Sequence, residues 1–233
     1  MNAATPIVAV CGLAREAAIA AGPGVLTVVG AGNSQRLARL LDEALAQGAR
    51  GVISFGIAGG VIRGLPAGSL VIGEAVVAGE ERFPVDLGWR DRLAERLPWA
   101  RIATVAGIER PAVDRAAKQS FHATTGVAAV DMESHVAARV AAARNLPFAL
   151  LRAVADPAER ELPPAALAPL RPDGTPDLRS ILVSLARRPA QLPAMLRLAF
   201  DARAAFASLL RSRRALGPGL GFPDLGDLVL DMA

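Results

Sequence analysis

The amino-acid sequence predicts an α/β fold, in which a central sheet is covered by helices on both faces. Short apolar runs, several of them ending in glycine, alternate with helical patterns along the first 155 residues. Hydrophobic residues make up 52% of the 233-residue chain, enough for a sizeable core. No uncharged apolar run reaches the ~18 residues of a membrane-spanning helix. These observations indicate a globular α/β core and exclude a largely disordered chain.

The predicted strands are continuous apolar runs, as expected for strands buried on both faces. The first, Pro6 to Gly12, has no basic segment and no cleavage signal before it. We therefore interpret the N-terminus as the first strand of a cytoplasmic protein rather than as a signal peptide. The other strands are predicted over residues 24–32, 51–60 (a strand and its loop), 69–79, 101–107, 126–131 and 147–156.

The predicted helices lie between these strands. Asn33 begins one that Gly48 ends, with Leu37, Leu41 and Leu45 at helical spacing. The next predicted helices cover residues 88–97, 112–121 and 132–145.

The composition changes after Asp156. A proline-rich segment is followed by two predicted helices, over about 178–188 and 193–214, and by a glycine-rich acidic tail. Residues 179–214 carry eight arginines and one aspartate. We predict a core over residues 1–160, a linker over 161–177 and a helical extension over 178–233.

Charge and cysteine content exclude several functions. The net charge is only +4, and Lys118 is the only lysine among 26 basic residues. With no tyrosine and 4% aromatic residues, the chain has little from which to build a base-stacking surface, so nucleic-acid binding is disfavoured. A single cysteine, Cys11, excludes an internal disulfide framework and a cysteine-based zinc site. His122 and His135 lack partners at metal-ligand spacing, so we expect no metal.

Three groups of residues at strand ends could carry chemistry, and each has a plainer alternative. Gly56–Gly60 would let backbone amides approach a ligand, or form a tight turn. Glu133 falls in the first turn of a helix, where a carboxylate can bind a ligand or simply cap the helix. Asp156 ends a buried strand, where α/β folds bind ligands, but an Asp-Pro turn would explain it too.

Together these groups resemble the nucleoside phosphorylase/nucleosidase superfamily, most closely its methylthioadenosine/S-adenosylhomocysteine nucleosidases. The matching stretches are SFGIAGGVIRGLPAGSLVIGEAVV and AAVDMESHVAARVAAARNLPFALLRAVADPA, and the resemblance covers roughly residues 6–158. It implies a three-layer, purine nucleoside phosphorylase-like α/β/α fold with a mixed sheet. It also implies a homo-oligomer in which a neighbouring subunit often completes the pocket, and Phe83 is a candidate for that contribution.

Within the superfamily, the GLAREA start, the VDMES stretch and the arginine-rich extension are similar to the hopanoid-biosynthesis-associated phosphorylases. This resemblance implies cleavage of the adenine–ribose bond of adenosylhopane, with no cofactor and with phosphate as a candidate co-substrate. A small nucleoside such as methylthioadenosine is the alternative substrate. A noncatalytic nucleoside-binding or membrane-surface scaffold is a second alternative, since the basic extension could dock at an anionic membrane or be a solvated face.

The resemblance also implies roles for individual residues. Asp156 would protonate adenine N7, for which its pKa should be raised, while Glu133 would stay ionised and bind the ribose hydroxyls. Glu16 would activate water, and Arg15 would bind phosphate. The other expected substrate contacts are Ile57, Ala58 and Gly59 (ribose or nucleophile), Asp131 and Met132 (ribose side), and Ala112 and Val113 (adenine).

The sequence departs from the family pattern at three points. Ile57 replaces a small hydroxyl residue, and Glu16 falls one residue short of the position expected for the base. The G-D-P-x-R phosphate loop of many phosphorylases is absent. The choice between hydrolysis and phosphorolysis therefore stays open.

Overall fold

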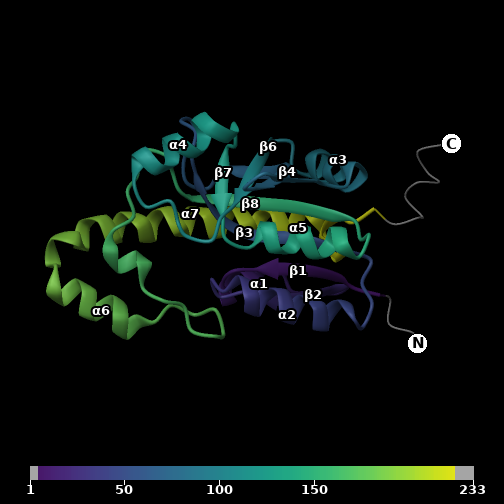
Figure 1. The fold of residues 1–233 in the computed structure, drawn as a ribbon, viewed down its shortest axis with the longest axis horizontal. Coiled ribbons are helices and arrows are strands. Elements are labelled where there is room, and N and C mark those ends of the chain that lie inside the picture. The colour runs from purple at the N-terminus through teal and green to yellow at the C-terminus, as the bar shows by residue number, and fades with distance from the viewer. Residues whose placement is uncertain (1–4, 224–233) are drawn as a thin grey trace.

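The computed structural model describes residues 5–223, in which eight strands form one mixed sheet with helices on both faces (Figure 1). This arrangement confirms the predicted fold class. The strands are β1 (Ile7–Cys11), β2 (Val25–Val29), β3 (Gly51–Gly60), β4 (Leu70–Ala78), β5 (Glu81–Pro84), β6 (Arg101–Gly107), β7 (Ala129–Asp131) and β8 (Phe148–Asp156).

Four of the α-helices begin at an Asn or Asp whose side chain accepts a hydrogen bond from a backbone N–H two or three residues on. These caps are Asn33, Asp86, Asp114 and Asp177. The helices are α1 (Ala14–Ala20), α2 (Ser34–Leu45), α3 (Leu87–Arg96), α4 (Arg115–Thr125), α5 (Ser134–Ala143), α6 (Leu178–Arg187) and α7 (Leu192–Leu216), with short 3₁₀ turns η1 (Pro164–Leu167), η2 (Pro189–Gln191) and η3 (Pro218–Gly221).

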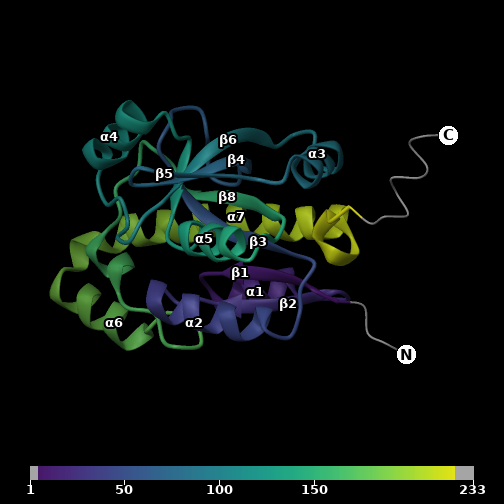
Figure 2. The ribbon, with the colours of Figure 1, turned by 45° about the vertical axis from the view of Figure 1, so that its right-hand side comes forward.

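Part of the sheet closes into a ring. The strands follow the order β2-β1-β3-β7-β6-β4-β5, and β8 pairs with both β3 and β4. Since β3 and β4 are also joined through β7 and β6, the strands β3, β8, β4, β6 and β7 form a closed circuit of pairings. Figure 2 shows β8 between β3 and β4. The C-terminal ends of β3 and β8 lie side by side, and β7 runs antiparallel along the end of β3.

Alternate residues of the strands feed two apolar layers. In β1, Val8 and Val10 pack toward α2 and α5, while Ile7, Ala9 and Cys11 pack toward α1, α3 and α7. Burial of both layers explains why the strands are continuous apolar runs, and burial of apolar side chains supplies most of the driving force for folding.

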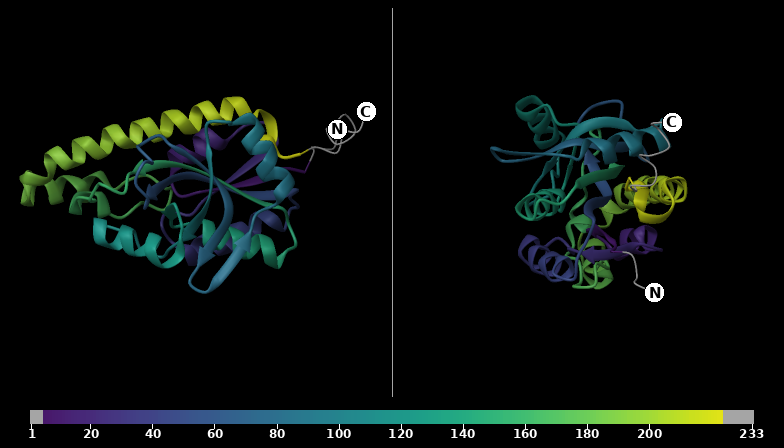
Figure 3. Two further views of the ribbon diagram at one scale, coloured as in Figure 1. Left: turned by 90° about the horizontal axis from the view of Figure 1, so that it is seen from above. Right: turned by 90° about the vertical axis from the view of Figure 1, so that its right-hand side faces the viewer.

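The C-terminal helices divide between the core and the solvent. The second half of α7 packs along β8 and α1, with Ala205, Phe206 and Leu209 buried, so this part of the predicted extension belongs to the core. By contrast, α6 has no buried residue, and together with the first half of α7 it projects beyond the sheet (Figure 3). Within residues 5–223, no helix combines the length and the apolar character needed to cross a bilayer.

One local feature differs from the prediction, and a second adds detail to it. Phe83, expected in a loop, lies in the short strand β5 opposite Val76 of β4. The start of the predicted tail is ordered against α3, where Trp89 Nε1 donates to Leu220 O at 3.1 Å and Phe222 stacks edge-on against the Trp89 ring. Residues 224–233, the acidic end of that tail, lie outside the described residues.

Candidate active site

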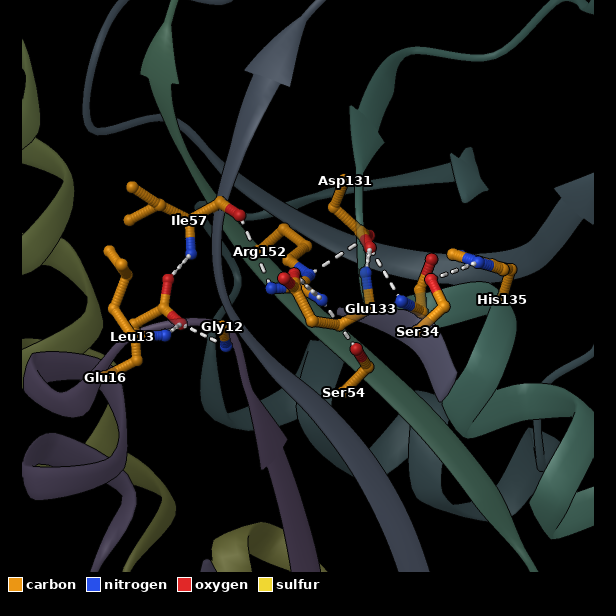
Figure 4. A network of polar contacts seen from close by, with 11 residues as sticks. Gly12, Leu13, Glu16, Ser34, Ser54, Ile57, Asp131, Glu133, His135 and Arg152 are labelled. Atoms are coloured by element: carbon orange, nitrogen blue, oxygen red, sulfur yellow. Dashed lines mark hydrogen bonds and ion pairs between the residues drawn. The ribbon is translucent and has the colours of Figure 1, made fainter. Parts of the chain in front are cut away.

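Arg152 occupies the centre of a buried polar cluster, which lies at the ends of β1 and β7 and beside the middle of β3 (Figure 4). It is fully buried in β8, and its guanidinium donates to Ser54 Oγ on β3 at 2.6 Å. It forms ion pairs with Asp131 at 3.1 Å and Glu133 at 3.5 Å. A buried cation needs such partners because its desolvation is costly.

Asp131 has a positioning role in this cluster. One carboxylate oxygen faces Arg152, and the other accepts hydrogen bonds from the backbone N–H groups of Glu133 (2.9 Å) and Ser134 (2.7 Å). It therefore fixes the start of α5. Both of its oxygens are engaged with protein groups, and the substrate contact expected for Asp131 stays a prediction.

Glu133 is held between the ends of three strands. Its carboxylate lies against the backbone of Gly12, close to the Arg152 guanidinium, and its Cγ lies near Gly30. The pKa of Glu133 is raised to about 8, chiefly by burial. Arg152 opposes this rise, and the neighbouring Asp131 and Glu16 carboxylates add to it. The ionised state expected for Glu133 with substrate bound stays a prediction.

Glu16 reaches the same cluster from α1. One oxygen accepts from Gly12 N (2.7 Å) and Leu13 N (2.9 Å), and the other accepts from Ile57 N at 2.7 Å. Burial raises its pKa, while Arg152 and these N–H groups oppose the rise. The structure thus places Glu16 beside Arg152 and the expected ribose contacts, although Glu16 lies one residue short of its expected position in the family pattern.

Three carboxylates, Glu16, Asp131 and Glu133, surround the single guanidinium of Arg152. With every group ionised, the cluster would carry a net charge of −2. Burial is the main cause of the raised pKa values of Glu16 and Glu133, and repulsion from Asp131 and Glu16 adds to the rise at Glu133. A buried site with this balance stabilises positive charge that develops on a ligand.

Asp156 lies across from Gly59, at the end of β8. Its Oδ2 accepts a hydrogen bond from the fully buried ammonium of Lys118 at 2.6 Å, while its Oδ1 is buried without a hydrogen-bond partner. Burial raises the pKa of Asp156, and Lys118 partly offsets the rise. The direction is the one predicted for an acid.

The glycine-rich segment is a strand rather than a strand and a loop. β3 continues to Gly60 because its end pairs with β7 on one side and with β8 on the other. Gly59 lies between Val130 and Asp156, where a Cβ would sit 3.4 Å from the Val130 side chain and 3.7 Å from Asp156 Oδ2. Glycine therefore keeps space beside the acid. Ile57 is half-buried at the edge of the cluster, and Ala58 is buried in the core.

The remaining predicted residues are spread around this centre. Met132 is half-buried between Asp131 and Glu133. Ala112 packs in a small apolar cluster, and Val113 O accepts from Leu162 N at 2.9 Å, which ties the predicted adenine segment to the chain after Asp156. Arg15 points elsewhere, with its guanidinium 4.3 Å from the centre of the Phe206 ring on α7.

Both histidines take part in hydrogen bonds. His122 Nδ1 lies 3.0 Å from Val127 O, and His135 Nε2 lies 3.0 Å from Glu109, which also accepts from Ser34. In the described part of the chain, no group of three or more His, Cys, Asp or Glu side chains is placed to hold a metal ion.

Sequence reasoning assigned no role to Arg152 or Lys118. Both carried a signal: Arg152 is the only charged residue inside an otherwise apolar strand, and Lys118 is the only lysine of the chain. A charged residue in a run predicted to be buried must have partners, so each was a candidate for the site.

Comparison with known proteins identifies the family. The chain belongs to the phosphorylase superfamily, whose family model matches residues 4–186. This confirms the predicted superfamily and, with it, an enzyme of the nucleoside phosphorylase or nucleosidase type. No curated protein matches the sequence significantly.

Solved structures share the fold at low sequence identity. Native futalosine hydrolase of Helicobacter pylori strain 26695 has a TM-score of 0.62 and 13% identity, over 90% of this chain and 97% of that one. Methylthioadenosine/S-adenosylhomocysteine nucleosidase from S. pneumoniae with a transition-state inhibitor has a TM-score of 0.63 and 15% identity, over 91% and 100%. An Asp-to-Asn mutant of the Helicobacter pylori nucleosidase with 5′-methylthioadenosine in the active site has a TM-score of 0.62 and 12% identity, over 90% and 98%.

Proposed function

We propose that the protein cleaves the N-glycosidic bond of an adenine nucleoside and releases adenine. The observation that carries this proposal is the meeting of Glu16, Glu133 and Arg152 in one buried cluster, with Asp156 at the end of the adjoining strand β8. The superfamily and the folds of the similar nucleosidases support the same reaction class.

The proposed chemistry needs an acid on one side of the bond and negative charge on the other. The leaving base is a poor anion, so Asp156 gives its proton to N7 as the C1′–N9 bond breaks. The ribose then acquires oxocarbenium character. Glu133 accepts hydrogen bonds from the ribose hydroxyls, and the carboxylate-rich cluster stabilises the positive sugar.

We further propose that water, rather than phosphate, attacks the ribose. The three carboxylates around Arg152 would repel a phosphate dianion, and the Arg15 guanidinium is engaged with Phe206 instead. Glu16, beside the Ile57 backbone, is the proposed base for water. Adenine release that requires phosphate, in the test described below, would instead indicate phosphorolysis.

The proposed substrate is adenosylhopane, following the resemblance to the hopanoid-associated group. The proposed partner is therefore a lipid-linked nucleoside, taken up by a cytoplasmic enzyme at a membrane surface. Methylthioadenosine is the second candidate, because nucleosidases of similar fold have been solved with it or with inhibitors of the same type.

The projecting helices give the membrane contact a physical basis. Leu182, Leu196 and Phe200 on α6 and α7 are each more than half exposed. Along α6, a cavity of about 680 Å³ is lined by Arg179, Arg187 and Arg188, together with Asp177 and uncharged residues. These three guanidiniums have no ion pair within residues 5–223. Apolar side chains next to unpaired arginines suit an anionic lipid surface.

The test is chromatographic measurement of adenine release from adenosylhopane and from methylthioadenosine, each with and without phosphate. Phosphate-independent release from adenosylhopane is the expected result. Release that requires phosphate would overturn hydrolysis, and release from methylthioadenosine alone would overturn the lipid substrate. Nucleoside binding without release would favour the scaffold alternative. Light scattering in the same buffer tests the predicted homo-oligomer.

The variant Asp156→Asn should still fold and should release no measurable adenine at neutral pH. Its melting temperature should fall, because the buried Lys118 ammonium loses its charged partner. A fully active variant would remove Asp156 from the role of acid.

A further inference from the structure

Lys118 is buried in a way that fixes its charge. It is the only buried residue of α4, and its ammonium lies within 3.5 Å of four oxygens. Asp156 Oδ2 is at 2.6 Å, Arg160 O at 2.9 Å, Pro157 O at 3.0 Å and Asp156 O at 3.5 Å. All four are acceptors, so only a protonated amine satisfies them.

The two carboxylate oxygens of Asp156 have different surroundings. Oδ2 is held by Lys118, whereas Oδ1 is buried with no hydrogen-bond partner within the described structure. A carboxyl that is fixed through one oxygen presents the other in a single direction. Oδ1 is therefore the oxygen of Asp156 that is left to meet a base.

The other charges near the acid come in a pair. Arg160, in the segment after β8, binds Asp201 of α7 at 2.8 Å, and both lie close enough to influence Asp156. Their effects on Asp156 have opposite signs and partly cancel. Lys118 is thus the one charge in direct contact with the acid, and it partly offsets the rise in the pKa of Asp156 that burial causes.

We propose that Lys118 is a positioning residue for the acid, which orients Oδ1 toward adenine N7 and neutralises the charge that Asp156 acquires on giving up its proton. In this step the O–H bond at Oδ1 and the C1′–N9 bond break, and the N7–H bond forms. The carboxylate that remains stays paired with the Lys118 ammonium. The contact becomes stronger as the negative charge develops, so it lowers the barrier. The inference rests on the proposed function.

Substitution of Lys118 separates charge from packing. We expect Lys118→Met to lower kcat for adenine release by about 100-fold, the usual cost of losing one preorganised donor, with little change in KM. Since only the protonated acid reacts, activity falls at high pH as Asp156 ionises. Loss of the cation raises the pKa of Asp156, so the alkaline limb of the kcat profile should move up by about one pH unit or more.

Three further variants sharpen the test. Lys118→Arg keeps the charge and should retain more activity than Lys118→Gln, which keeps only a hydrogen-bond donor. Arg115→Met removes a charge from the same helix, where Arg115 pairs with Glu161 at the surface, and should behave as wild type.

A purely structural Lys118 would lower stability and leave the alkaline limb in place, and that result would overturn the proposal. If Lys118→Met does not fold, the kcat profiles of Lys118→Arg and Lys118→Gln are compared instead. Equal alkaline limbs in these two variants would likewise overturn the proposal.

A separate readout distinguishes failure of this inference from failure of the proposed function. Carbon-13 NMR of carboxyl-labelled aspartate, with Asp156→Asn to assign the signal, follows the titration of Asp156 in the free protein. Lys118→Gln should raise its midpoint even if no nucleoside is cleaved. An unchanged midpoint would overturn the inference, whereas a raised midpoint with no adenine release from any substrate would overturn only the proposed function.

Discussion

The Glu133 carboxylate lies so close to Gly12 that a Cβ on that glycine would come within 2.6 Å of Glu133 Oε1. Gly12 is the residue directly after β1, and its N–H also donates to Glu16. One backbone position without a side chain therefore serves two carboxylates of the cluster. Glycine is required at position 12 because the methyl group of an alanine there would displace Glu133 from Arg152.

The first prediction concerns Gly12→Ala. We expect adenine release to fall by about 100-fold, since a displacement of about 1 Å at a catalytic contact can cost that much. Gly88→Ala, at a position in α3 with ordinary contact distances, is the control and should be fully active. Wild-type kinetics in Gly12→Ala would show that Glu133 needs no fixed position.

The second prediction concerns the stability of the buried cluster. Arg152→Met leaves Asp131 and Glu133 without their cation, and removal of one partner of a buried ion pair costs about 3–5 kcal/mol. Urea unfolding measures the difference. Arg39→Met, which breaks an exposed pair with Glu43, should change the free energy of unfolding by about 0.5 kcal/mol or less. Equal effects of the two variants would contradict the central role of Arg152.

The third prediction concerns pH. The pKa of Glu133 rises from the ordinary 4.5 to about 8 on folding, so the folded chain holds one more proton than the unfolded chain between these values. The stability that this proton confers is complete below about 4.5 and is lost as the pH rises toward 8. A single proton accounts for a decline of at most about 1.4 kcal/mol per pH unit.

Urea titrations from pH 5.5 to 8.5 test this slope. Glu133→Gln cannot ionise, so its stability should depend less on pH than that of the wild type. If the stabilities of the wild type and Glu133→Gln changed in parallel with pH, a group other than Glu133 would be responsible for the decline. Since Glu133 must accept hydrogen bonds from ribose, kcat/KM of the wild type should also increase as the pH approaches 8.

The fourth prediction concerns the projecting helices. Leu196→Ser with Phe200→Ser should abolish cosedimentation with phosphatidylglycerol vesicles and leave methylthioadenosine cleavage, where present, unchanged. Leu87→Ser, at an exposed leucine on α3, is the matched control and should bind vesicles normally. If the double variant instead changes the oligomeric state and wild type ignores vesicles, this face is a protein interface.

The strands that build the site could be predicted because they are buried on both faces. β6 has the predicted bounds, and β8 differs by one residue at its start. β5 was missed because its four residues, ERFP, are mostly exposed and carry no apolar pattern. The end of β3 was predicted as a loop because glycine disfavours strands locally, and only pairing on both sides overrides that preference.

The site could be predicted in part. Strand ends marked Glu133 and Asp156, and both lie in or beside the polar cluster. The partners of these acids, Arg152 and Lys118, depend on which elements meet in space. Lys118 is 38 residues from Asp156 in sequence, and nothing near it on α4 indicates an acid. Local patterns indicate which charged residues are unusual, whereas the tertiary fold decides which of them pair.

The closed circuit of strands constrains how the protein can open. β3, β7 and β8 cannot separate one at a time at the site, because each is bonded to neighbours that lead back to the others. Local opening must therefore start in the connecting segments, such as residues 108–114 and 157–163. In hydrogen–deuterium exchange, the amides of β3 and β8 should exchange last and together, at the rate of global unfolding, while these segments exchange early.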